Sequence, residues 1–458
     1  MERIEEINGI INGIVWGPYM LIFLVGTGVL YTIWTKCFQV TKWSLWWANT
    51  LGTIFGKNKQ KTLVTGKAIS PFQAVTTALS STVGTGNIVG VATAVYLGGP
   101  GAVFWMWVSA FFGMMTKFSE VVLAVKFRET DEKGFYHGGP MYYIQNGLGA
   151  KWKPLAVIFA ILATLATFGI GNMTQSNAIA SSFHVTFGAP PLVTGIVIAV
   201  LVALVIIGGI KRIGQVTEKL IPFMCVFYII GCLIIVIMNI TRIPGVFASI
   251  FSGAFGFNSA AGGVVGYTLM QTIRRGIARG VFSNEAGLGS APIAHAASAQ
   301  KDPVKQGVWG VFEVFVDTII ICTLSGLVIV LAGEYTKVSG SELTIASFSQ
   351  TFGAFGGVFV SLSILFFAGS TIIGWSYYGE QSLNFLTNKN KTAVLIYKVI
   401  FCLVAIVGAT GGLTMVWDIA DTLNGLMAIP NLIALLMLRK VVIGLTKKFL
   451  ETGSAIES

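Results

Sequence analysis

Apolar segments of about 20 residues recur along this chain from Ile14 almost to its C-terminus. The hydrocarbon core of a bilayer is about 30 Å thick, which a helix of roughly 20 residues crosses. Charged residues make up only 11% of the 458 residues, whereas soluble domains are about one quarter charged. We therefore predict an all-α polytopic membrane protein with no sizeable soluble domain.

Dividing the apolar segments at charged residues and at Pro/Gly clusters predicts eleven transmembrane helices. They cover residues 14–34, 70–97, 100–126, 154–183, 191–209, 219–239, 264–298, 306–332, 354–385, 393–410 and 413–438. Residues 38–55 are too short and too polar to span, and their tryptophans favour an interfacial amphipathic helix on the cytoplasmic face. Because Glu2, Glu5 and Glu6 stand where a signal peptide carries basic residues, we expect the first helix to be retained.

Lysine and arginine are concentrated in alternate connections between the expected helices. Of the 30 Lys and Arg residues, 22 fall in the connections on one side, whereas the other side holds only Arg3, Arg242 and Lys337. The positive-inside rule then predicts an outside N-terminus and a cytoplasmic C-terminus, in the cell membrane. The net charge of +11 therefore reflects orientation in a membrane and does not indicate nucleic acid binding.

Two of the expected helices are interrupted by glycine and polar residues. The second contains SSTVGTGNIVG at residues 80–90, and the seventh contains RGVFSNEAGLGSAP at residues 279–292. Irregular backbone at membrane depth is tolerated where it is buried in protein or lines a cavity. Free N–H groups at the start of a half-helix attract a carboxylate, and unwound carbonyls coordinate a cation. The alternative is that these glycines only allow close helix packing.

The two interrupted helices lie five spans apart, which predicts an inverted repeat because five is odd. Each is followed by a long helix with a similar start, GAVFWMWV from Gly101 and GVWGVFEVFV from Gly307. Paired interruptions of this kind indicate a transporter site. The expected organisation is residues 1–67 for an N-terminal and an interfacial helix, 68–242 and 243–438 for the two repeats, and 439–458 for a cytoplasmic tail.

Three long segments closely resemble the alanine or glycine:cation symporter family, which includes the sodium:alanine symporters of the amino acid-polyamine-organocation superfamily. They are PFQAVTTALSSTVGTGNIVGVATAV at residues 71–95, GGPGAVFWMWVSAFFGM at 98–114 and GIARGVFSNEAGLGSAPIA at 276–294. The resemblance covers essentially the whole chain. It implies an alternating-access carrier with a LeuT-like, five-plus-five inverted-repeat core preceded by one extra helix. It further implies sodium as the coupling ion and alanine or glycine as substrate. We also expect no organic cofactor and function as a monomer.

A more distant resemblance links VGTGN at residues 83–87 to the unwound first core helix of the neurotransmitter:sodium symporters. It implies that the amides of Gly84, Thr85 and Gly86 meet the substrate carboxylate. The sodium ligands that it implies are the carbonyls of Ser80, Val83 and Phe367 and the hydroxyls of Ser370 and Thr371 for one ion, and the carbonyl of Thr82 with the side chain of Asn87 for a second. These relatives use an asparagine of the next helix for the second ion, and residues 304–331 show no clear counterpart.

Further substrate contacts are expected on the fourth, seventh and ninth helices. The candidates are Phe168, Asn172, Gln175, Phe282, Ser283, Asn284, Thr371 and Trp375. Asn172 and Gln175 share a helical face, and their amides either bind a substrate ammonium or join helices to one another. Trp375 lies one turn from Thr371, and it either closes the pocket around a small side chain or packs against lipid.

Ionisable residues inside expected spans usually face a cavity or a partner. They are Lys117, Glu120, Arg274, Arg275, Arg279, Glu285, Glu313, Asp317, Glu380, Asp418 and Asp421. Lys117 and Glu120 are three residues apart on one helix, so they are expected to neutralise each other. The three arginines are expected to pair with Glu285, Glu313 or Asp317 as structural or gating links.

Other function classes find less support in these residues. The chain has no G-x-x-x-x-G-K-[ST] for an ATP-driven pump, and His137, His184 and His295 lie in separate regions without metal spacing, so we expect no enzyme. A glycine-rich polar segment also suits a channel filter, but two different interrupted helices in one chain favour a single enclosed site. Proton coupling stays open as the nearer alternative and predicts an essential membrane carboxylate.

Overall fold

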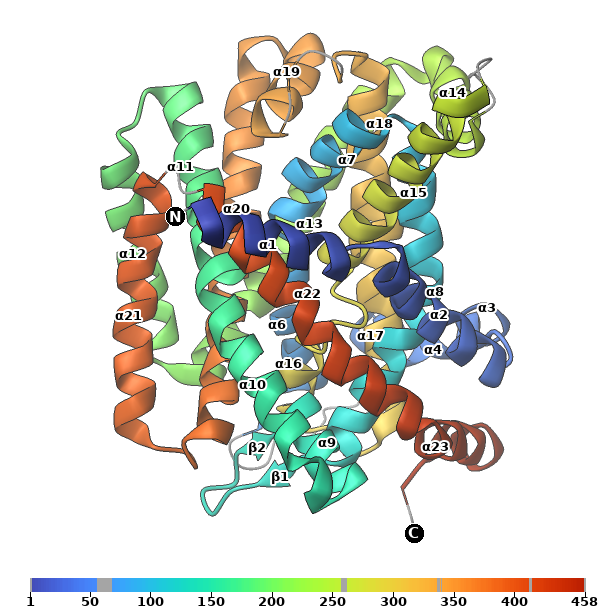
Figure 1. Ribbon diagram of the computed structural model, residues 1–458, viewed down its shortest axis with the longest axis vertical. Helices are drawn as coiled ribbons and strands as arrows, with labels where there is room; N and C mark the ends of the chain where they lie inside the picture. The colour runs from blue at the N-terminus through green and yellow to red at the C-terminus, as the bar shows by residue number, and fades with distance from the viewer. Residues whose placement is uncertain are drawn as a thin grey trace.

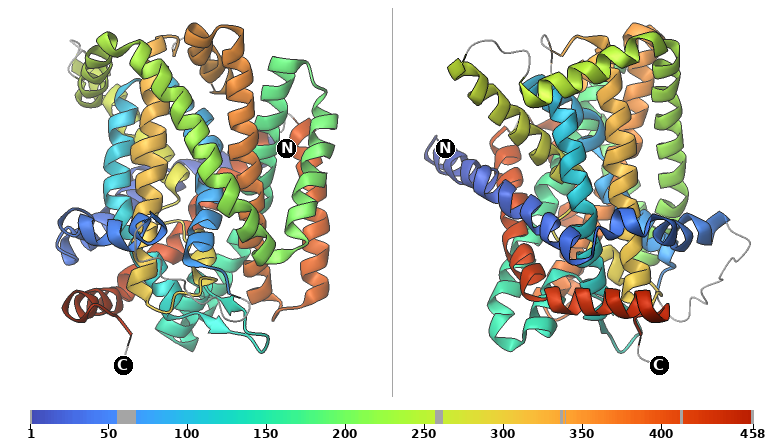
Figure 2. Two further views of the ribbon diagram at one scale, coloured as in Figure 1. Left: turned by 180° about the vertical axis from the view of Figure 1, so that it is seen from behind. Right: turned by 90° about the vertical axis from the view of Figure 1, so that its right-hand side faces the viewer.

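The computed structural model describes residues 2–55, 68–256, 262–335, 338, 340–411 and 414–456. These residues form a helical bundle with one short antiparallel hairpin, in which Glu129 pairs with His137 and Thr130 with Tyr136. Figures 1 and 2 show most helices running along the long axis of the molecule. Lys57, Lys59, Lys61, Lys67 and Lys337, which contributed to the expected orientation, lie outside the described residues.

The N-terminal part forms two longer and three short helices. They are α1 (Glu2–Val15), α2 (Pro18–Trp34), α3 (Phe38–Thr41), α4 (Trp43–Asn49) and α5 (Leu51–Phe55). The expected single interfacial helix is therefore wrong in its continuity, because the backbone leaves the helical region at Lys42 and at Thr50. Trp46 is also buried, with its Nε1 donating to Gln39 O at 3.1 Å.

The next part of the chain contains the first interrupted helix. Its elements are α6 (Pro71–Thr82), η1 (Gly86–Gly90), α7 (Val91–Gly98), α8 (Gly101–Lys126), β1 (Glu129–Thr130), β2 (Tyr136–His137), α9 (Pro140–Leu148), η2 (Ala150–Trp152), α10 (Lys153–Phe168), η3 (Gly169–Met173), α11 (Thr174–Phe187), α12 (Pro191–Ile206), α13 (Gly209–Met238), η4 (Ile240–Arg242) and α14 (Ile243–Phe255). Of the helical elements here, η1 and η3 are π-helical, a form that often occurs at functional sites.

The remaining part contains the second interrupted helix. Its elements are α15 (Gly262–Asn284), α16 (Pro292–Ala296), α17 (Pro303–Val314), η5 (Phe315–Cys322), α18 (Thr323–Ala332), α19 (Gly340–Phe352), α20 (Ala354–Leu386), α21 (Lys391–Thr410), α22 (Thr414–Met437) and α23 (Arg439–Thr452). Here η5 is a third π-helical segment, inside the span that follows the second interruption. All eleven expected ranges contain helix.

Besides α1, which precedes most of the expected first span, four helices and the hairpin were not expected from the sequence. These helices are α9, α14, α19 and α23, which have 9 to 14 residues each. The hairpin, α9 and α23 lie at one end of the bundle, which we call the hairpin end, and α14 and α19 lie at the opposite end (Figure 1). Segments of this length are too short to cross a bilayer, so a search for spans passes over them.

The described residues contain eight helical segments that are long and apolar enough to cross a membrane, or nine if α6 and α7 count as one bent span. The shorter α12 is also apolar, and it packs against α21 at the edge of the bundle (Figure 1). The chain is therefore a multi-pass membrane protein. The predicted total of eleven crossings and the inverted repeat stay predictions.

The start of α6 is strongly determined by its sequence. Ser70 Oγ accepts a hydrogen bond from Gln73 N at 3.0 Å, and Gln73 Oε1 accepts one from Ser70 N at 3.1 Å. This capping box precedes Pro71 at the first helical position. From Ala74 to Thr82 every side chain is buried, so the helix leads directly into the interior of the bundle, where its regular hydrogen bonding stops.

Candidate functional site

The first break separates α6 from η1 and α7, and the two helical parts are bent by 47° from one another. Val83 leaves the helical region with φ −79° and ψ 87°. Gly84 N donates to Asn87 Oδ1 at 2.9 Å, and Thr85 N donates at 3.4 Å to Gln175 Oε1 of α11. Side-chain amides thus take the place of the carbonyls that a continuous helix would provide for these N–H groups.

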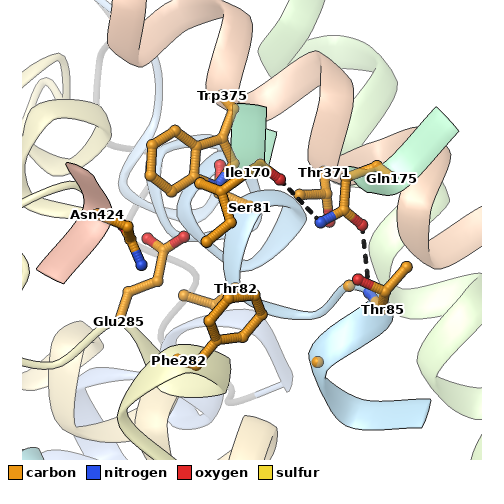
Figure 3. A pocket seen from close by; sticks show the side chains of 12 residues that line it. Ser81, Thr82, Thr85, Ile170, Gln175, Phe282, Glu285, Thr371, Trp375 and Asn424 are labelled. Atoms are coloured by element: carbon orange, nitrogen blue, oxygen red, sulfur yellow. Dashed lines mark hydrogen bonds between the residues drawn. The ribbon is translucent and has the colours of Figure 1, made fainter. Parts of the chain in front are cut away.

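A central cavity with about 300 Å³ of space not filled by protein atoms lies beside this break. Its lining comes from seven helical elements (α6, η1, η3, α11, α15, α20 and α22) and from the two breaks (Figure 3). The lining residues are Ser81, Thr82, Gly84, Thr85, Gly86, Ile170, Gln175, Phe282, Glu285, Thr371, Trp375 and Asn424. Polar main chain and side chains therefore meet large apolar side chains, as in sites for small organic ligands.

Seven of the sequence-predicted substrate residues line this cavity: Gly84, Thr85, Gly86, Gln175, Phe282, Thr371 and Trp375. Gly86 lies close to the second interrupted helix, since a Cβ built on it would stand 3.3 Å from Ser283 Cα. A Cβ on Gly84 would collide with the Thr371 hydroxyl. Only glycine at these two positions leaves the main chain open to the cavity.

The remaining predicted substrate residues face other partners. Asn172 Nδ2 donates to Phe401 O at 2.7 Å, so this amide joins η3 to α21. Phe168 packs against Tyr397 and Phe401 with centroid distances of 5.4 and 6.1 Å. Of the two amides left open by the sequence, Gln175 is the one at the cavity, with its Nε2 donating to Ile170 O at 3.0 Å (Figure 3).

The predicted ligands of the first sodium ion meet between α6 and α20. Ser370 Oγ lies 3.3 Å from Ser80 O and 2.8 Å from Phe367 O, and Thr371 Oγ1 lies 2.9 Å from Phe367 O. Val83 ends α6 one turn beyond Ser80. Neutral carbonyl and hydroxyl oxygens are the donors that a hard alkali cation prefers, so these residues fit sodium.

The predicted ligands of the second sodium ion have a different environment. Asn87 Oδ1 accepts from Gly84 N, while its Nδ2 donates to Asp317 Oδ1 at 2.7 Å. Ser283 Oγ donates to Asp317 Oδ2 at 3.0 Å, and Thr318 Oγ1 does so at 2.7 Å. Asp317 therefore lies beside Asn87. It belongs to residues 304–331, the segment in which the sequence shows no counterpart to the asparagine that the distant relatives use for the second ion.

Ser283 and Asn284 turn toward η5 and away from the cavity lining. Besides the Ser283 contact with Asp317, Asn284 Nδ2 donates to Thr318 Oγ1 at 3.1 Å. Their predicted role as direct substrate contacts is therefore not reflected in the side-chain geometry. They join the second interrupted helix to η5 instead.

The second break runs from Glu285 to Ala291, between α15 and α16. Glu285, Gly287 and Gly289 all have positive φ, of 55°, 93° and 81°. Glu120 Oε1 of α8 accepts hydrogen bonds from Gly287 N at 3.1 Å and Gly289 N at 3.0 Å. Asn431 Nδ2 donates to the same oxygen at 2.5 Å, so a buried carboxylate clamps the main chain of this break.

Two sequence expectations about buried charges are wrong. Lys117 forms its ion pair with Glu313 at 3.2 Å and not with Glu120, and His295 Nε2 lies 2.9 Å from the other oxygen of Glu313. Arg274 and Arg279 of α15 also have other partners than expected. Arg274 Nε donates to Trp16 O at 2.9 Å, and the Arg279 guanidinium lies 5.2 Å from the Phe282 ring centroid. Spacing along one helix did not reveal these contacts between helices.

Two further cavities lie on either side of the central one. One of about 620 Å³ shares Thr85, Gly86, Ile170 and Phe282 with it and extends to Arg279, Asp418 and Asp421. The other, of about 1510 Å³, lies at the hairpin end and reaches Tyr377 and Gln381 of α20. Trp375 of the same helix lines the central cavity, and its ring centroid lies 5.5 Å from that of Tyr378.

The hairpin joins this end of the bundle to the second break. Arg128 Nη1 donates to Ala296 O and Ser298 O at 2.9 and 2.6 Å, which caps the end of α16; burial lowers the pKa of Arg128 to about 10. The Asp131 carboxylate is partly desolvated, but hydrogen bonds from Phe135 N, Lys133 N and His137 hold its pKa below the usual range.

Comparisons with known proteins agree with this geometry. The sequence matches the sodium:alanine symporter family over residues 1–457. It is 48% identical over 458 residues to the sodium/alanine symporter AgcS of Methanococcus maripaludis, covering 98% of each chain.

Two solved structures show the same fold at low sequence identity. MhsT, crystallised with L-phenylalanine, has a TM-score of 0.54 at 14% identity over 84% of this chain and 99% of its own. The Eremococcus coleocola manganese transporter has a TM-score of 0.53 at 14% identity over 83% of this chain and 77% of its own. The predicted LeuT-like transporter fold is thereby confirmed.

Proposed function

This chain belongs to the sodium:alanine symporter family of secondary active transporters, and we propose that it carries alanine, glycine or another small neutral amino acid into the cell together with sodium. The observation that carries this proposal is the central cavity, which lies between an open stretch of main chain and a cluster of neutral oxygens. A zwitterion and an alkali ion fit side by side in such a site.

The substrate carboxylate would lie at the first break. Thr85 and Gly86 precede the α7 half-helix, whose N-terminal end carries a partial positive charge. Gln175, which already accepts from Thr85 N, is placed to orient this main chain. Ile170, Phe282 and Trp375 leave little room beyond the cradle, which favours a small side chain.

Coupling to sodium follows from the contact between the two sites. Thr371 lines the substrate cavity and also stands among the predicted sodium ligands, directly beside Gly84. An ion that holds Thr371 and the end of α6 in place also holds the carboxylate cradle in place. Because binding linkage is reciprocal, the substrate then raises the affinity for sodium by the same factor. A second ion near Thr82, Asn87 and Asp317 is part of the same proposal.

Alternating access requires a path from each side to the central cavity. The cavity that reaches Asp418 and Asp421 provides one, with Phe282 and Ile170 at the boundary. The cavity at the hairpin end, which Tyr377 and Gln381 of α20 line, provides the other. Lys133, Lys211, Lys389 and Lys391 line the latter, which supports the hairpin end as the cytoplasmic side of the cell membrane.

Proton coupling is the competing mechanism, because a buried carboxylate, Glu285, lines the cavity. We propose that the protein functions as a monomer. The deciding experiment is uptake of labelled alanine and glycine into liposomes that contain the purified protein. Sodium, potassium and proton gradients are imposed separately. Uptake that needs only an inward sodium gradient supports the proposal; uptake driven by protons alone in sodium-free buffer overturns the coupling, and no uptake of either amino acid overturns the substrate. Enzymatic activity and an organic cofactor have no role in this proposal.

A further inference from the structure

Glu285 has a position in the cavity that neither the break nor the predicted sodium ligands explain. Its side chain is 2% exposed, and Figure 3 shows the carboxylate directed into the cavity between Asn424 and Trp375. A buried carboxylate is costly unless it is paired or hydrogen-bonded. The ammonium of Lys117 acts on Glu285 electrostatically, but the ion pair that it forms within 4 Å among the described residues is with Glu313, at 3.2 Å.

The local structure orients this carboxylate. Ser290 Oγ, which is also buried, donates to Glu285 Oε2 at 2.6 Å. Glu285 itself adopts φ 55°, a conformation that Gly287 and Gly289 adopt in the same break. Glycine adopts it without strain, whereas the Cβ of any other residue is strained there. A glutamate at this position is therefore better explained by its side chain than by the turn.

Two further acceptor atoms at the cavity are unpaired. Ser81 Oγ and Asn424 Oδ1 are buried and have no hydrogen-bond partner among the described residues. Both residues line the central cavity together with Glu285. The first break offers N–H donors, whereas this part of the cavity offers oxygen acceptors and one carboxylate. A zwitterionic ligand has complementary groups for both parts.

We infer that the Glu285 carboxylate, with the oxygens of Ser81 and Asn424 beside it, forms the subsite for the ammonium group of the substrate. This inference rests on the proposed function and adds the residue that selects α-amino acids over acids without an amine. Ser290 is a positioning residue for Glu285. The substrate class is a small zwitterion whose carboxylate meets Thr85 and Gly86 and whose ammonium meets Glu285.

The test measures binding to purified protein in saturating sodium, with L-alanine and with L-lactate, in which a hydroxyl replaces the ammonium group. The wild-type protein is expected to bind alanine at least 100-fold more tightly than lactate. Glu285→Gln should weaken alanine binding about 30-fold or more, the effect of removing one partner of a buried charge pair. Lactate binding should stay within about threefold, so that the ratio of the two affinities falls.

Three variants make the test specific. Glu285→Asp keeps the charge and should retain part of the alanine preference, and Ser290→Ala should lower it less than Glu285→Gln does. These two also serve if Glu285→Gln fails to fold. Glu218→Gln is the matched control, because Glu218 hydrogen-bonds Gln73 at 2.6 Å and does not line the cavity; it should match the wild-type protein.

Several results would overturn the inference. Equal losses for alanine and lactate would show that Glu285 acts only through the structure of the break. Unchanged alanine affinity with uptake that no longer responds to pH would make Glu285 a proton carrier. If the wild-type protein binds neither alanine nor glycine in sodium, the proposed function itself fails; if it binds them and Glu285→Gln binds them equally well, only this inference fails.

Discussion

The two interrupted helices break in the same layer of the protein, but their main chains are used differently. At the first break, two N–H groups are met by neutral amides, and Thr85 and Gly86 still line the cavity. At the second, a buried carboxylate, Glu120, accepts from Gly287 N and Gly289 N. The main chain of the first break therefore forms part of the cavity wall at Thr85 and Gly86, whereas the main chain of the second break is held by a buried carboxylate.

This difference explains why glycine serves two purposes in the molecule. Gly84 and Gly86 keep space free, since a Cβ at either would meet Thr371 or Ser283. Gly287 and Gly289 have φ of 93° and 81° and allow a tight turn. A glycine-rich break in a membrane helix thus does not by itself indicate that its main chain binds a ligand. The partners of its N–H groups must be known first.

The largest expected effect is at Gly86, in the proposed carboxylate cradle of the first break, and it is compared with a change at another glycine of the same element. Gly86→Val should abolish alanine binding, with a loss of more than about 100-fold, because even its Cβ would stand 3.3 Å from Ser283 Cα. Gly90→Ala is the control in the same π-helical turn, where the nearest atom to an added Cβ is Thr85 O at 3.8 Å. Equilibrium binding of labelled alanine measures both; retained affinity in Gly86→Val would show that the cradle lies elsewhere.

The next effect concerns the clamp at the second break. Glu120→Leu leaves two buried N–H groups and the Asn431 amide without their acceptor, which should cost about 3 kcal/mol or more of unfolding free energy. Glu120→Gln keeps an acceptor and should lose less. Thermal unfolding in detergent measures the loss, and alanine affinity of the protein that remains folded should change little. A Glu120→Leu protein with wild-type stability would contradict the clamp.

A smaller effect is expected at the hydroxyl that connects the first break to α20. Thr371→Ala should raise the sodium concentration for half-maximal alanine uptake about tenfold, since one oxygen ligand is lost. Thr371→Ser keeps the oxygen and serves as the control. An unchanged sodium dependence in Thr371→Ala would remove this residue from the ion site.

The smallest effect is a pH dependence confined to the hairpin and to α16, the helix that follows the second break. The depressed pKa of Asp131 stabilises the hairpin at neutral pH, and this contribution is lost as the pH falls through the Asp131 pKa in the folded state, below its ordinary value of about 4. Because Arg128 links the hairpin to α16, the hydrogen-exchange protection of residues 128–137 and 292–296, corrected for the intrinsic exchange rate at each pH, should fall on acidification.

The matched variant for this prediction is Asp131→Asn, which should already exchange faster at neutral pH, by less than about tenfold, and respond less to acid. Residues 84–90 of the first break should show no such change in either protein. Acceleration at both breaks together would mean that the hairpin acts on the whole bundle and not on α16 alone.

The sequence by itself determined the membrane class, the main helices and the positions of both breaks. Each of these depends on neighbours along the chain: the length of an apolar segment, a capping box at Ser70, and glycine beside polar residues at 80–90 and 285–292. The more distant resemblance predicted sodium ligands around Ser370 and Thr371, and the structure brings these residues together.

Only the tertiary structure decided which side chains face one another. Asn172 and Gln175 share a helical face, yet one meets α21 and the other meets Thr85. Lys117 forms its ion pair with Glu313 and not with Glu120. Asp317 accepts a hydrogen bond from Asn87, and Glu285 lines the cavity. Helix formation depends on residues within a few positions, whereas these contacts depend on how helices cross and rotate against partners that lie far away in the sequence.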